Sequence, residues 1–135
     1  MNKKIIAVAL TIAMIAIVMS ATSNSALDES TISQTIFVDA VYESKSSIVK
    51  ITYNDNSEKT NLVTLEILGM EETFHREYAW SSFVETVQIN SEPKYGWSTT
   101  PVVFSINHDE FGKIGIKTEI YEQGESKPRI IYSKI

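Results

Sequence analysis

The segment KIGIKTEIY, residues 113–121, alternates apolar and polar side chains with a strict period of two. Ile114, Ile116, Thr118 and Ile120 fall on one face, and mostly charged residues fall on the other. Because successive side chains of a strand point to opposite faces, this pattern predicts a β-strand that is buried on one side only.

A similar strand pattern, rich in Ile, Val, Thr, Tyr and Phe, recurs along the chain. It is found in TIFVDAVY (35–42), SIVKITY (47–53), LVTLEILG (62–69), TFHREYAW (73–80), FVETVQI (83–89), PVVFSIN (101–107) and RIIYSKI (129–135). A helix is the alternative for 73–80, although its apolar residues do not repeat well at every third or fourth position. Glu85 shares a face with Phe83 and Val87, which predicts a strand at a sheet edge. Such short strands at roughly ten-residue spacing predict an antiparallel sandwich.

The final third of the chain, PVVFSINHDEFGKIGIKTEIYEQGESKPRIIYSKI, combines several of these signals. An apolar strand is followed by a turn with glycine, a strictly alternating strand, a polar loop and a closing strand. This order resembles the last three strands of secreted immunoglobulin-like and fibronectin type III-like domains. The resemblance implies an all-β, antiparallel immunoglobulin-like sandwich of seven or eight strands. It implies no particular function, because such sandwiches host many unrelated ones.

Residues 1–25 predict a hydrophobic signal helix for export. Two lysines precede an apolar run of about 15 residues, from Ile5 to Met19, and small polar residues follow from Ser20. A bilayer-spanning helix needs roughly 20 apolar residues, which favours cleavage, after Ser20 or after about Ser25. The alternative is an uncleaved membrane anchor formed by residues 5–21. We therefore expect a secreted or extracytoplasmic β-sandwich domain over residues 26–135.

The expected domain is acidic and contains no cysteine. Of the 12 basic residues, Lys3 and Lys4 lie in the predicted signal, which leaves 10 against 17 acidic residues and a net charge near −7. This charge disfavours nucleic acid and anionic membrane surfaces as partners. We expect contact with a membrane only through the N-terminal segment, if that segment is not cleaved.

Few residues offer catalytic chemistry. No cysteine supplies a thiol nucleophile, no G-x-S-x-G stretch supplies a nucleophile elbow, and only two histidines are present. We therefore expect no enzyme activity and no cofactor.

Metal binding is the alternative function. His75 and Glu77 would project from one face of a strand, and His108 and Asp109 lie in a predicted turn. Together they would offer nitrogen and oxygen ligands to Zn²⁺ or Cu²⁺. The competing interpretation is that both histidines face solvent. The oxygen-rich loop NDNSEKTN, residues 54–61, is a candidate for Ca²⁺ or a simple polar turn.

The segment PKYGWSTTP, residues 93–101, carries the leading function hypothesis. Tyr95 and Trp97 flank Gly96 in a predicted loop, and Tyr78 and Trp80 lie in a second aromatic segment. Aromatic faces form stacking platforms for a sugar ring or a partner's side chain. The competing interpretation is that Trp97 plugs the core and leaves Tyr95 exposed. We expect an exported, non-catalytic module that binds a protein or a glycan.

Overall fold

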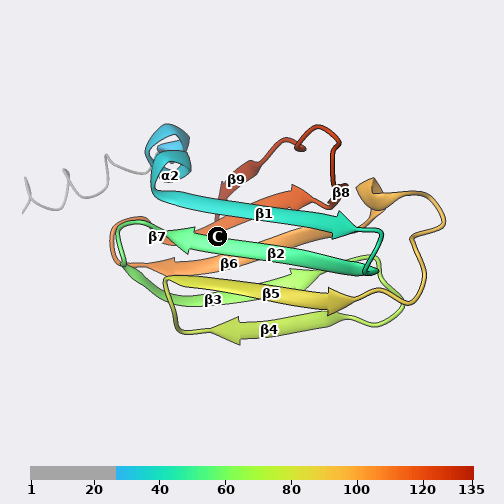
Figure 1. The fold of residues 1–135 in the computed structure, drawn as a ribbon. Helices are drawn as coiled ribbons and strands as arrows, with labels where there is room; N and C mark the ends of the chain where they lie inside the picture. The colour runs from blue at the N-terminus through green and yellow to red at the C-terminus, as the bar shows by residue number, and fades with distance from the viewer. Residues whose placement is uncertain (1–26) are drawn as a thin grey trace, which may run out of the picture.

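A computed structural model describes residues 27–135, and the predicted export signal lies outside them. The described residues form two β-sheets that pack face to face as a sandwich (Figure 1). Besides the helix α2 (Glu29–Thr35) and the 3₁₀ turn η1 (Trp97–Thr99), the elements are β1 (Ile36–Glu43), β2 (Ile48–Asp55), β3 (Thr60–Ile67), β4 (Phe74–Tyr78), β5 (Ser82–Gln88), β6 (Pro101–His108), β7 (Gly112–Glu119), β8 (Tyr121–Glu122) and β9 (Ile131–Lys134).

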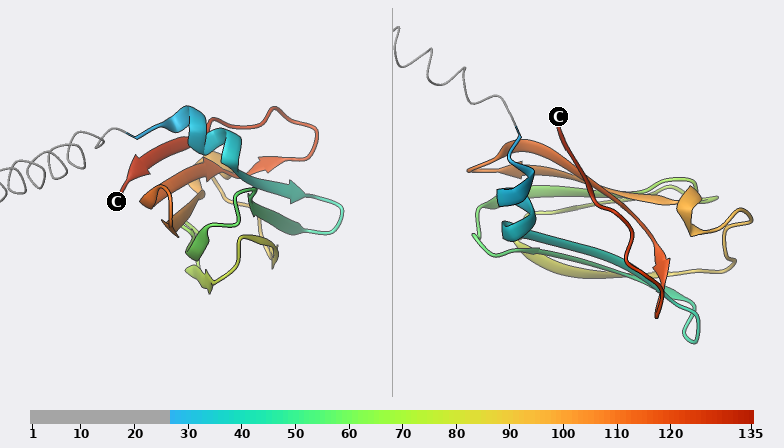
Figure 2. Two further views of the ribbon diagram at one scale, coloured as in Figure 1. Left: turned by 90° about the vertical axis from the view of Figure 1, so that its left-hand side faces the viewer. Right: turned by 90° about the horizontal axis from the view of Figure 1, so that it is seen from above.

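One sheet has the strand order β5-β2-β1-β8, and the other has the order β4-β3-β6-β7-β9. The predicted β-sandwich is therefore confirmed, and 73–80 contains a strand, β4, rather than a helix. The end-on view separates the two layers (Figure 2).

The prediction of seven or eight antiparallel strands is wrong in two respects. The described residues form nine strands, and β8 pairs with β1 in parallel, so that one sheet is mixed. The alternating segment 113–121 is divided at Ile120, where the chain passes from β7, between β6 and β9 in one sheet, to β8 at the edge of the other. Since a single residue separates β8 from β7, β8 keeps the direction of β7 and lies parallel to β1.

The helix α2 was not predicted. The Asp28 side chain caps it by accepting from the backbone N–H of Thr31 at 3.1 Å. Ile32 is its single buried residue, and it covers one end of the core. The β-branched residues that begin at Ile36 favour the extended backbone that follows. Within residues 27–135, no helix is long and apolar enough to cross a membrane.

The core lies between the two sheets and contains the inward residues that alternation predicted. Ile114, Ile116, Thr118 and Ile120 are all buried, as their shared face required. Tyr53 is fully buried, with its ring 5.2 Å from that of Phe83 and 6.0 Å from that of Phe104. Rings from both sheets therefore interlock across the interface.

The connection between β8 and β9 covers one long side of the sandwich (Figure 1). Lys127 donates from Nζ to the backbone carbonyl of Val38 at 3.0 Å, and the same Nζ lies 4.3 Å from the centre of the Phe37 ring. Tyr121 donates to Asp39 at 2.9 Å. These contacts hold the connection against β1 and occupy hydrogen-bonding groups of that strand.

The opposite long side lies between the edge strands β4 and β5. Arg76 and Tyr78, both on β4, donate to the carboxylate of Glu85 on β5. The Glu85 side chain is only 13% exposed and points inward from its strand, as its place in the sequence predicted. Burial, followed by the hydrogen bond and the charge of Glu85, raises the pKa of Tyr78 to about 12.

Replacing Glu85 tests how much this side contact stabilises the sandwich. We expect Glu85→Gln to lower the free energy of unfolding by about 1 kcal/mol, because the ion pair with Arg76 is lost and both hydrogen bonds lose the carboxylate's charge. Glu77→Gln is the matched control on β4, since Glu77 is exposed on the outer face. Urea denaturation measures both variants, and equal losses would contradict the contact's role.

Candidate functional site

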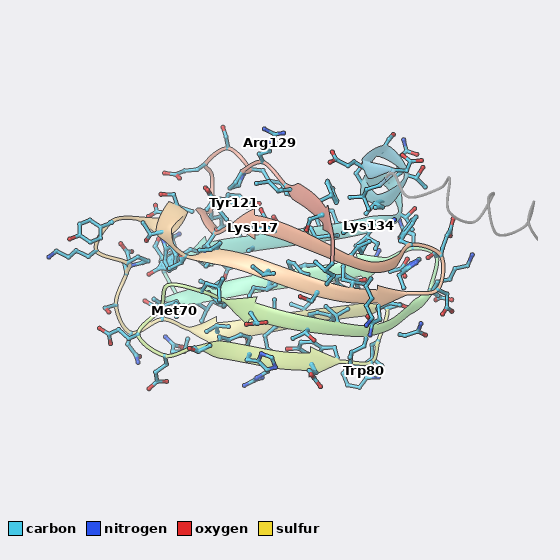
Figure 3. All side chains as sticks on the ribbon, turned by 180° about the vertical axis from the view of Figure 1, so that it is seen from behind. Met70, Trp80, Lys117, Tyr121, Arg129 and Lys134 are labelled. Atoms are coloured by element: carbon cyan, nitrogen blue, oxygen red, sulfur yellow. The ribbon has the colours of Figure 1, made fainter. Side chains whose placement is uncertain are left out.

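A cavity of about 540 Å³ opens at one end of the sandwich. Its walls are the β3–β4 loop, the last residues of β5, and the long segment that joins β5 to β6. Met70, from the first of these walls, lies at this end, and Trp80 lies at the opposite end (Figure 3). The helix α2, where the chain enters the domain, also lies at the Trp80 end (Figures 1 and 3).

Local backbone contacts shape the walls. Leu68 donates from its backbone N–H to the carbonyl of Pro101 at 3.0 Å, which ties the β3–β4 loop to the start of β6. Gly69 follows with φ of +79°, and a Cβ atom there would lie 2.4 Å from the carbonyl oxygen of Thr99. Glycine is therefore required by both backbone angle and space.

The predicted aromatic residues Tyr95 and Trp97 both line this cavity. Trp97 is half-buried, packs against the core, and has its ring centre 4.7 Å from that of Tyr42. Tyr95 is 77% exposed. Trp97 thus covers the end of the core and also forms part of the cavity wall, whereas the ring of Tyr95 is exposed.

The other two predicted aromatic residues do not line the cavity. Trp80 is 66% exposed in the β4–β5 turn, and Tyr78 stacks on Phe83 with ring centres 3.8 Å apart. The structure therefore places these four aromatic residues in two pairs at different parts of the sandwich.

The four predicted metal ligands are not brought together. His75 and Glu77 lie exposed on β4, and His75 Nδ1 is 3.8 Å from Glu66. His75 pairs with Glu66 and His108 pairs with Thr60, six positions apart along β3, which is about 20 Å. No group of three or more His, Asp or Glu side chains within residues 27–135 is arranged to hold a metal ion.

His108 is buried, so the expectation that both histidines face solvent is wrong for this one. Its Nδ1 accepts from the backbone N–H groups of Glu110 at 3.1 Å and Phe111 at 3.2 Å. The proton of a neutral ring then lies on Nε2, which donates to Asp55 Oδ2 at 3.0 Å. Asp109, its predicted companion, is exposed and instead accepts from Asn61 at 2.6 Å.

Ser57 gives this cluster the composition of a catalytic triad but not its geometry. Its hydroxyl lies 3.2 Å from His108 Nε2, the same nitrogen that faces Asp55. A triad needs one ring nitrogen for the nucleophile and the other for the carboxylate. Here the second nitrogen is occupied by two backbone donors, so His108 has no free position from which to accept the serine proton.

The carboxylate of Asp55 is the centre of this buried cluster. Oδ1 accepts from the backbone N–H and the hydroxyl of Ser57, at 2.9 and 2.6 Å. Oδ2 accepts from the backbone of Lys59, from Thr60 Oγ1 and from His108. Because Thr60 gives its proton to Asp55, the buried Tyr53 hydroxyl donates to Thr60, at 2.8 Å.

These bonds change the interpretation of the oxygen-rich loop 54–61. Burial alone would raise the pKa of Asp55, but the hydrogen bonds from Ser57, Thr60 and Lys59 outweigh it and hold this pKa below its usual value. The carboxylate expected to offer oxygen to Ca²⁺ is already surrounded by donors. Sequence reasoning missed this role, although Ser and Thr shortly after an Asp are a signal for such local bonds.

Replacing Asp55 should change how the free energy of unfolding depends on pH. The lowered pKa means that the carboxylate stabilises the fold above about pH 4 and that this contribution disappears as pH falls through the folded-state pKa. We expect Asp55→Asn to cost about 3 kcal/mol at pH 7 and less as the pH falls below 4. Urea denaturation from pH 3 to 7 measures the difference, with the exposed Asp109→Asn as control. A difference that does not change with pH would contradict this account.

Gly69 and Gly96 form a matched pair of positions that tests the close approach of Gly69 to Thr99. Both have positive φ angles, but a Cβ atom at Gly96 would meet nothing within 4 Å. We expect Gly96→Ala to lower the free energy of unfolding by about 1 kcal/mol through backbone strain alone. Gly69→Ala adds the clash with Thr99 and should cost about 3 kcal/mol. Equal costs in thermal or urea unfolding would show that the loops do not touch.

Comparison with known proteins identifies no relative: no family model, no curated protein and no solved structure matches this chain.

Proposed function

We propose that this protein is an exported, non-catalytic β-sandwich module that binds a protein or a glycan outside the cytoplasm. The observation that supports this most is the cavity of about 540 Å³ that Tyr95 and Trp97 line. Its volume falls within the roughly 300–1,000 Å³ that ligand sites occupy. An exposed aromatic ring at its rim offers the large, rigid contact area on which sugar rings and protein side chains stack.

We further propose that the sandwich is immunoglobulin-like, of the fibronectin type III kind. Strands β1, β2 and β5 share one sheet, while β3, β6 and β7 share the other. This distribution corresponds to strands A, B and E against C, F and G. β4 joins the second sheet beside β3, the place of strand C′, and β8 and β9 are additions. By this correspondence the C–C′ and E–F loops line the cavity, at the end opposite the B–C and F–G loops that bind the ligand in variable immunoglobulin domains.

The proposal of a non-catalytic role rests on the two histidines. Both ring nitrogens of His108 are engaged by Asp55, Ser57 and two backbone N–H groups. His75 lies on the exposed outer face of β4, with its Nδ1 3.8 Å from Glu66. Neither histidine lines the cavity. This arrangement favours binding over hydrolysis.

The proposed location is secreted or extracytoplasmic, through the export signal in residues 1–25, with an anchor formed by residues 5–21 as the alternative. In either case the cavity lies at the end of the domain remote from α2, the first element of the described chain (Figure 1). An anchored form would therefore hold the cavity away from the membrane. The net charge near −7 supports a partner other than nucleic acid.

Two exposed aromatic residues at opposite ends provide the test. The domain is applied to a panel of neutral oligosaccharides and a panel of peptides, and the affinity of each ligand is measured. We expect Tyr95→Ala to weaken binding about tenfold, because the stacking ring is lost, and Trp80→Ala to leave it unchanged. No binding in either panel, or loss only in Trp80→Ala, would contradict the proposal.

A further inference from the structure

We infer that the cavity binds a lysine or arginine side chain of an extended segment in a partner protein. This inference rests on the proposed binding function and specifies its ligand. It follows from an apolar floor, an acidic rim and an exposed strand edge that meet at one place.

The floor of the cavity is apolar. Met70, Phe74, Val87 and Trp97 are half-buried lining residues, and Ile89 is buried beneath them. Lysine and arginine bury long aliphatic stems against such surfaces while their charged ends stay at the opening. The guanidinium plane of arginine also stacks on aromatic faces.

The rim is acidic. Glu71, Glu72 and Glu92 are exposed lining residues, and Lys94 is the one basic residue among the lining residues. Within residues 27–135, none of these three carboxylates forms an ion pair or a hydrogen bond with another group, whereas Glu85 is paired with Arg76. An anionic ligand would be repelled, and a cation would find carboxylates that no internal charge neutralises.

Lys94 shows how this rim accommodates a cation. Its Nζ lies over the Tyr95 ring, 5.5 Å from the ring centre. The ring therefore already receives a positive charge from within the chain. Because Lys94 already occupies the Tyr95 ring, a partner's cation would contact the carboxylates of the rim instead.

An extended segment is favoured by the position of β5. This strand lies at the edge of its sheet, and its last residues, Val87 and Gln88, line the cavity. An exposed edge can pair with an added strand through main-chain hydrogen bonds, while a neighbouring pocket selects a side chain. A segment added at this end of β5 would place alternate side chains towards the cavity.

The test is a titration followed by ¹H–¹⁵N NMR spectroscopy of the domain. One probe is an acetylated, amidated pentapeptide with a single arginine among glycine and serine residues, and its control has glutamine in place of arginine. We expect the arginine peptide to shift the amide signals of residues 69–74 and 87–97 and the indole signal of Trp97. The glutamine peptide should shift them at least fivefold less, and 0.5 M NaCl should weaken the arginine peptide's effect.

Two triple variants that each remove three negative charges distinguish an effect of the rim carboxylates from an effect of the net charge. Glu71→Gln, Glu72→Gln and Glu92→Gln together should weaken the arginine peptide at least fivefold. Glu119→Gln, Glu122→Gln and Glu125→Gln, which lie outside the cavity lining, should leave its affinity unchanged. Equal effects of the two triples, or equal shifts with both peptides, would overturn the inference.

A neutral oligosaccharide distinguishes this inference from the proposed function. If the sugar shifts the same signals and the arginine peptide does not, the basic-segment inference fails and binding at the cavity stands. If neither probe shifts them, both the inference and the proposed site fail.

Discussion

The buried carboxylate of Asp55 is the constraint on which one end of this sandwich depends. Its five donors come from the β2–β3 turn, from the start of β3 and from the end of β6. Through His108, the same charge orients the ring whose other nitrogen fixes the β6–β7 turn. Because an unsatisfied buried carboxylate is far more costly than any one of these bonds, the three segments hold one another in place. The charge of Asp55 thus links β2 of one sheet to β3 and β6 of the other.

The opposite end of the sandwich is held in another way. There the loops are tied by backbone hydrogen bonds, such as that from Leu68 to Pro101, and by the close approach of Gly69 to Thr99. The ring of Trp97 rests on Tyr42 and closes the core. Few charged side chains are used in this packing, which leaves carboxylates free at the rim.

Sequence alternation identified the strands because inside and outside are local properties of an extended chain. The same reasoning missed α2, whose seven residues bury only Ile32 and show no helical period. It also missed the break at Ile120, because the alternation of apolar and polar residues continues while the chain passes to the other sheet. The burial of His108 could not be predicted from the sequence, because its partner Asp55 is 53 positions away. Tyr95 and Trp97, which line the cavity, were singled out because a glycine and two prolines mark their loop, but the acidic rim depends on how two distant loops meet.

The separation of the two ends has an evolutionary consequence. The residues around the cavity contribute nothing to the Asp55 cluster, so changes at the exposed lining positions leave that cluster intact. Substitutions at the exposed positions of the β3–β4 and β5–β6 segments therefore cost little stability. One end of this scaffold can therefore change in sequence while the buried cluster at the other end maintains the fold.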